Sequence, residues 1–106
     1  MNAETLASSP FFKNEEKSRY ELNIDGHIAF IDYKETSTKI ALTHTEVPAE
    51  LGGKGVAVAL VEKTLASIEG TDKKILPYCP FVLKYIKKHP EWKKLVSETF
   101  PQYNEI

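Results

Sequence analysis

The chain has 106 residues, a length that predicts a single domain with a modest hydrophobic core. Its formal net charge of -1 provides no excess of positive charge for nonspecific nucleic-acid binding. No apolar run approaches the roughly 18 residues of a membrane-spanning helix, and residues 1–12 lack the basic and apolar regions of a secretory signal. We therefore expect a cytoplasmic protein. The single cysteine cannot form an internal disulfide, and no C-x-x-C pair indicates a metal site.

Residues 1–17 are polar and show no clear period, so we interpret them as a flexible lead-in to a single domain over residues 18–106. A hairpin is predicted next, because Tyr20, Leu22 and Ile24 alternate with polar residues. The dipeptide Asp25-Gly26 follows and tolerates positive φ at both centres of a type I′ turn.

The strand after this turn continues through Tyr33, and polar residues 36–39 connect it to a third strand over residues 40–47. On that strand alternation places Ile40, Leu42 and His44 on one face and Ala41, Thr43 and Thr45 on the other. These three strands are expected to form an antiparallel meander.

Apolar residues then recur at helical spacing from residue 55 to residue 69, and Gly70 is the expected C-cap. Residues 73–76 form a short strand, which a right-handed crossover places parallel to residues 40–47. Pro80 begins the next helix, where its missing N–H has no cost, and further helical turns follow Pro90. The predicted fold is α/β (α+β): a mixed, mostly antiparallel sheet with a β-α-β crossover and C-terminal helices.

Three of the five glycines, Gly52, Gly53 and Gly55, lie in the turn between the third strand and the first long helix. Backbone N–H groups at a helix start lack intrahelical partners, and the helix dipole adds partial positive charge there. An anion such as pyrophosphate fits this turn, with Lys54 adding charge at its rim. The Walker and dinucleotide glycine patterns are both absent. A turn that only connects two elements is the alternative interpretation.

The segment "VPAELGGKGVA", residues 47–57, resembles the acetyl-CoA pyrophosphate loop of the GNAT acyltransferases. Gly55 and Ala57 occupy the last two fixed positions of that motif, and Gly52 stands where the family usually has Arg or Gln. A second segment, "LPYCPFVLKYIKKHPEW" at residues 76–92, is similar to the small stand-alone YjdJ-type group of GNAT-like N-acetyltransferase domains.

This resemblance implies a minimal GNAT-like fold that binds acetyl-CoA or coenzyme A and transfers an acetyl group to an unidentified amine, either a small molecule or a protein lysine. The residues it implies for cofactor binding are Val47, Gly52, Gly53, Lys54, Gly55, Val56 and Ala57. The alternative function is a non-catalytic CoA-binding or acyl-CoA-binding module, or a protein-interaction domain. Its motivation is that the chain lacks the N-terminal strand-helix-helix portion of larger GNAT enzymes.

Cys79 and His44 are the candidate catalytic residues. Cys79 immediately precedes Pro80, so it is expected at a helix N-cap, where a thiolate is favoured. The resemblance implies that the cysteine at this position is an active-site residue, whereas an inert, packed cysteine is the alternative. His44 ends its strand and is a candidate base toward Cys79 or an amine, because residues 44–47 and 76–79 are expected side by side. A core histidine with its hydrogen bonds satisfied is the alternative.

The basic residues of the last helices are interpreted as a solvated face or as a contact for the 3′-phosphate of CoA. They are Lys84, Lys87, Lys88, Lys93 and Lys94.

Overall fold

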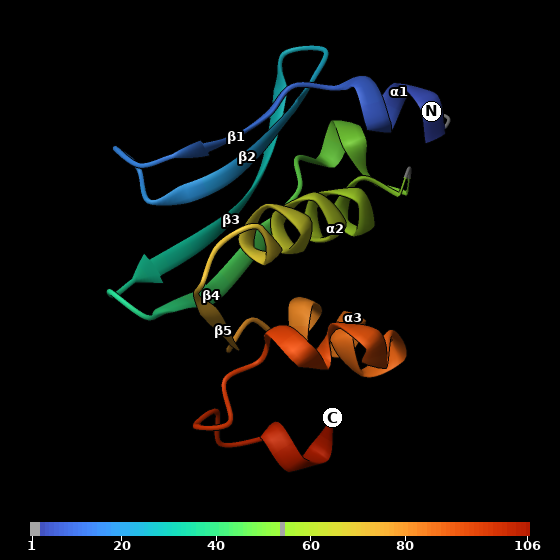
Figure 1. Ribbon diagram of the computed structural model, residues 1–106. Helices are drawn as coiled ribbons and strands as arrows, with labels where there is room; N and C mark the ends of the chain where they lie inside the picture. The colour runs from blue at the N-terminus through green and yellow to red at the C-terminus, as the bar shows by residue number, and fades with distance from the viewer. Residues whose placement is uncertain (1–2, 54) are drawn as a thin grey trace.

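The computed structural model describes residues 3–53 and 55–106 (Figure 1). In chain order its elements are α1 (Ala3–Ser8), β1 (Phe11–Asn14), β2 (Arg19–Ile24), β3 (His27–Glu35), β4 (Lys39–Glu46), η1 (Ala49–Leu51), α2 (Val56–Glu69), β5 (Lys74–Pro77), α3 (Pro80–Lys88), η2 (Pro90–Leu95) and η3 (Tyr103–Glu105), where η denotes a 3₁₀-helix. The strands form one sheet in the order β1-β2-β3-β4-β5. The first four strands are antiparallel and β5 runs parallel to β4. The predicted mixed sheet with one β-α-β crossover is therefore confirmed.

The hairpin of β2 and β3 turns at the predicted dipeptide. Asp25 has φ 53° and Gly26 has φ 85°, so both central residues adopt the positive φ that a type I′ turn requires. The side chain of Asn23 also accepts a hydrogen bond from the N–H of Gly26 at 2.9 Å. Local sequence chemistry alone thus specifies this turn.

The N-terminal segment contains two elements that the sequence pattern did not indicate, α1 and β1. β1 pairs with β2 and sets Phe11 opposite Leu22, which places residues 11–14 in the sheet rather than in a lead-in before it. The ring of Phe11 stacks on Tyr20 with 6.1 Å between the centroids. Residues 11–14 lie in a segment without a clear period, and their pairing with β2 decides their conformation.

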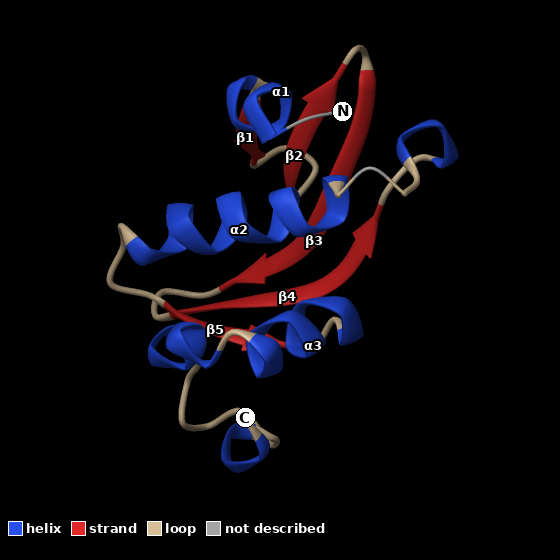
Figure 2. Ribbon diagram, turned by 90° about the vertical axis from the view of Figure 1, so that its right-hand side faces the viewer, coloured by secondary structure: helices blue, strands red, loops and turns tan. Residues whose placement is uncertain are grey.

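The long helices lie on a single face of the sheet. Figures 1 and 2 show α2 and α3 side by side over that face, and the hydroxyl of Tyr85 on α3 donates to the carboxylate of Glu62 on α2 at 2.8 Å. α2 buries one stripe of side chains against the sheet: Val56, Leu60, Val61, Thr64, Leu65 and Ile68. Each large apolar side chain buried in this way contributes about 1.5–3 kcal/mol. Among the described residues, no helix covers the opposite face of the sheet.

The C-terminal part begins as predicted and then departs from regular α-helix. Pro80 is the first residue of α3, and Cys79 is its N-cap. After Pro90 the chain forms the 3₁₀-helix η2 rather than another α-helical turn. Val96 then forms a parallel bridge with Ile75, so the chain returns to the outer edge of β5.

Candidate functional site

β4 and β5 separate at one end of their pairing, and this separation is the centre of the candidate site. The register sets Pro77 opposite Leu42, and the next backbone hydrogen bond is from the N–H of Cys79 to the carbonyl oxygen of Leu42 at 2.8 Å. The expected neighbours 44–47 and 76–79 are therefore not aligned, because β4 runs on to Glu46 while β5 stops. Among the described residues, the backbone of β4 beyond Leu42 has no strand partner on this side. We call this stretch of β4, residues 43–46, the open edge of β4, because it has no strand partner on this side among the described residues.

The glycine-rich turn lies at the same end of β4 and leads into α2 (Figure 2). Gly53 and Gly55 have φ 73° and 74°, a left-handed conformation that glycine adopts without strain. Gly55 is the N-cap of α2, and no side chain caps the helix. The first N–H groups of α2 are consequently available to an anion, and the helix dipole adds partial positive charge.

The remaining residues predicted for cofactor binding have different environments. The N–H of Gly52 already donates to the carbonyl oxygen of Ala49 at 3.1 Å, so the free part of the turn begins at Gly53. Val47 is half-buried and packs against the core. Val56 is buried as the first residue of α2, whereas the following Ala57 is half-buried. Lys54, predicted at the rim of the turn, lies outside the described residues.

Cys79 occupies the predicted N-cap position at the start of α3. It has φ -65° and ψ 123°, its side chain makes no capping hydrogen bond, and it is 3% exposed. Its sulfur lies 3.2 Å from the hydroxyl oxygen of Thr45 on β4, which is hydrogen-bond distance for sulfur. Thr45 was not among the predicted site residues, because simple alternation placed it on the face opposite Ile40 and Leu42.

A β-bulge in β4 places His44 on the face of the sheet opposite to the one predicted. Leu42 is opposite Tyr33 whereas His44 is opposite Asp32, so Thr43 is an extra residue and alternation reverses after it. His44 therefore points to the face without helices, and its side chain is 57% exposed, 3.5 Å from the carboxylate of Glu46. The prediction that His44 shares a face with Leu42 is wrong. Thr45 occupies the side that faces Cys79.

A comparison with family models agrees with these features. Residues 19–95 match the model of the GCN5-related N-acetyl-transferase family, which covers most of the chain. The chain belongs to the GCN5-related N-acetyltransferase (GNAT) family. Membership supports acyl-CoA-dependent acetyl transfer as the general activity. A search of the curated proteins found no match. The matched part of this GNAT domain begins at β2 and includes the open edge of β4, the glycine-rich turn and Cys79.

Two grooves of the GNAT domain flank the first turns of α2. The groove between α2 and α3 has a volume of about 310 Å³ and is lined by Val58, Phe81, Lys84, Tyr85, Lys88 and His89. Burial, together with the hydrogen bond to Glu62, raises the pKa of Tyr85 to about 12, so the phenol is neutral at pH 7. Tyr85 also stacks on His89 with 4.3 Å between the ring centroids.

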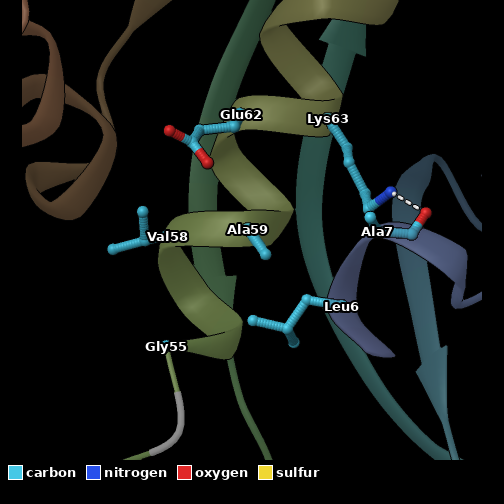
Figure 3. A pocket seen from close by; sticks show the side chains of 7 residues that line it. All are labelled: Leu6, Ala7, Gly55, Val58, Ala59, Glu62 and Lys63. Carbon is cyan, nitrogen blue, oxygen red and sulfur yellow. Dashed lines mark hydrogen bonds between the residues drawn. The ribbon is translucent and has the colours of Figure 1, made fainter. Parts of the chain in front are cut away.

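The second groove lies between α1 and α2, and Figure 3 shows its lining. Leu6 points toward Ala59, and the ammonium group of Lys63 donates to the carbonyl oxygen of Ala7 at 3.1 Å. Val58 and Glu62 point away from α1 (Figure 3), and Val58 also lines the groove between α2 and α3. The two grooves thus meet along the exposed side of α2.

Within residues 3–53 and 55–106, the GNAT domain contains no group of three His, Cys, Asp or Glu side chains placed to hold a metal ion. None of the described helices is long and apolar enough to cross a membrane.

Proposed function

We propose that this GNAT domain binds acetyl-CoA and transfers its acetyl group to an amine. The observation that carries the proposal is the gap where β4 continues past β5. The uncapped start of α2 follows the end of β4, and Cys79 lies against Thr45 in the gap. In this arrangement the backbone N–H groups from Gly53 to Ala57 bind the pyrophosphate, because no Cβ at Gly53 or Gly55 obstructs its approach.

The open edge of β4 suits the pantetheine arm of the cofactor. That arm carries two amide groups, which pair with a free strand edge in the way that an added strand does. An arm paired with residues 43–46 would extend from the glycine-rich turn toward Cys79, and its thioester would lie in the gap between the strands.

The groove between α2 and α3 suits the nucleotide end of CoA. It provides two ammonium groups, Lys84 and Lys88, and an aromatic wall at Tyr85. The groove between α1 and α2 is less suitable for a phosphate, because the one ammonium group among its described lining residues, that of Lys63, is bonded to the carbonyl oxygen of Ala7. We therefore assign the 3′-phosphate to Lys84 and Lys88.

Two routes of transfer fit this geometry. In the direct route the amine nitrogen attacks the thioester carbonyl carbon, the C–S bond breaks and CoA leaves as a thiolate, while a water molecule accepts the proton that the amine loses. In the covalent route the thiolate of Cys79 first attacks the same carbon and releases the CoA thiolate. The amine then attacks acetyl-Cys79, the C–S bond to the cysteine breaks and releases its thiolate, and a water molecule accepts the proton that the amine loses. Both routes have the same overall reaction, in which acetyl-CoA and an amine give the acetylated amine and CoA.

A non-catalytic CoA-binding module is the second candidate function, and the position of His44 favours it. Cys79 contacts Thr45 but not the imidazole, which points to the other face of the sheet. A buried thiol without a neighbouring base is a weak nucleophile.

Mass spectrometry of the intact protein after incubation with acetyl-CoA tests these functions, with Cys79→Ala as the matched variant. The proposal predicts acetylation of an amine panel by the wild type, with a stable acetyl adduct on Cys79 if the covalent route operates. If calorimetry shows that both proteins bind CoA and neither acetylates any amine, the chain is a CoA-binding module and not an enzyme. No binding of CoA would refute both functions.

A further inference from the structure

The contact between Thr45 and Cys79 joins two positions that are 34 residues apart, and both residues lie at the gap between β4 and β5. Thr45 is half-buried, and among the described residues its hydroxyl makes no hydrogen bond other than the one with the cysteine sulfur. The contact is therefore specific to these two side chains.

The β-bulge of β4 creates this contact. Thr43 is the extra residue, and its hydroxyl donates to the carbonyl oxygen of Asp32 at 3.3 Å. Without the bulge, regular alternation would turn His44 toward the gap and Thr45 away from it. The strand thus presents a hydroxyl to Cys79 at the position where an imidazole would otherwise lie.

A hydroxyl and an imidazole act differently on a thiol. A threonine hydroxyl does not accept the thiol proton as a base does, but its O–H donates to a sulfur that carries negative charge and favours that charged form. The bond also fixes the direction of the sulfur, which has no other polar contact in the described part of the chain.

We propose that Thr45 is a positioning residue for Cys79, whose hydroxyl holds the sulfur at the open edge of β4 and donates a hydrogen bond to it when it is negatively charged. This inference rests on the proposed function. In the covalent route the bond weakens as the sulfur joins the acetyl carbon and re-forms when the amine displaces the thiolate. In the direct route it keeps the sulfur oriented beside the thioester.

The test uses the fact that Cys79 is the only cysteine of the chain. Its rate of alkylation by iodoacetamide is followed by intact mass from pH 6 to pH 10, and absorbance of the thiolate at 240 nm gives a second reading. Thr45→Val removes the hydroxyl but keeps the branched shape that suits a strand. Thr45→Ser keeps a hydroxyl and serves as the rescue.

Thr64→Val is the matched control, because Thr64 is fully buried on α2 and its hydroxyl has no hydrogen-bond partner in the described structure. We expect T45V to raise the midpoint of the alkylation profile by about one pH unit, since a hydrogen bond to the charged form is lost. T45S and T64V should keep the wild-type midpoint. If T45V does not fold by circular dichroism, Thr45→Ala replaces it.

A T45V profile that overlays the wild-type profile would overturn the inference, and so would an equal shift in T64V. The test needs no CoA, so its result is independent of the proposed function. A shifted midpoint in T45V, together with absence of CoA binding to the wild type, would refute the proposed function and support the contact. A T45V protein that binds CoA as the wild type does but forms acetyl-Cys79 about tenfold more slowly at pH 7 would support both.

Discussion

Leu42 and His44 point to opposite faces of the sheet although they are only two positions apart on β4. Leu42 is fully buried opposite Tyr33, while His44 is largely exposed opposite Asp32. One inserted residue, Thr43, reverses the alternation between them. The two residues predicted to be catalytic, His44 and Cys79, consequently lie on different sides of the sheet.

Replacement of His44 by glutamine should leave the reactivity of Cys79 unchanged, because the imidazole does not face the thiol. We expect the midpoint of the alkylation profile to stay within the error of the wild-type value. The same iodoacetamide assay measures it. A displaced midpoint in H44Q would show that His44 acts on Cys79 and would contradict the bulge as described.

Replacement of Gly53 by alanine should weaken CoA binding about tenfold or more, since a methyl group then faces the pyrophosphate. Gly26→Ala is the matched control. Both glycines have positive φ, and a methyl group added at either position would enter open space, so both variants carry a similar backbone strain of about 1–2 kcal/mol. Isothermal titration calorimetry with CoA separates the two, and an equal loss of affinity in both variants would place the pyrophosphate elsewhere.

Replacement of Lys84 and Lys88 by alanine should weaken binding of CoA by about threefold to tenfold. The affinity for 3′-dephospho-CoA should not change, because the removed charges contact only the 3′-phosphate. Lys87, which is exposed on the same helix and does not line the groove, provides the control variant. Titration of each variant with both ligands measures the difference. Equal weakening for both ligands would indicate that the lysines do not contact that phosphate.

The ion pairs of Glu35 should make stability fall in acid. Hydrogen bonds from Lys13 and Lys73, only partly offset by burial, hold the pKa of Glu35 below its ordinary value of 4.5. The stabilisation is therefore present above pH 4.5 and is lost as the pH falls through the lowered pKa. Glu35→Gln should lower the free energy of unfolding by up to about 1 kcal/mol at pH 7 and by much less at pH 3.

Urea denaturation at the two pH values measures this difference, with Glu98→Gln at an exposed position as the control. Because Lys13 lies on β1, the same substitution should also speed hydrogen exchange in that strand. An effect of E35Q that is equal at both pH values would argue against an electrostatic origin.

The sequence by itself determined the features that depend on neighbouring residues. The Asp25-Gly26 turn follows from its two positive φ angles, α2 from its apolar period, and the N-cap at Cys79 from the proline after it. The glycine-rich turn before α2 was recognisable because only a few residue types suit a left-handed backbone. These preferences operate within a few positions of the chain, so a sequence pattern displays them.

The tertiary structure decided what depends on partners that are distant in the chain. β1 is a strand because β2 pairs with it, and the bulge at Thr43 exists because β3 and β4 pair with an offset of one residue. That offset exchanged the faces predicted for His44 and Thr45. A single-residue shift in pairing leaves no mark on local composition but reverses every side chain beyond it, and so only the folded sheet shows which residue meets Cys79.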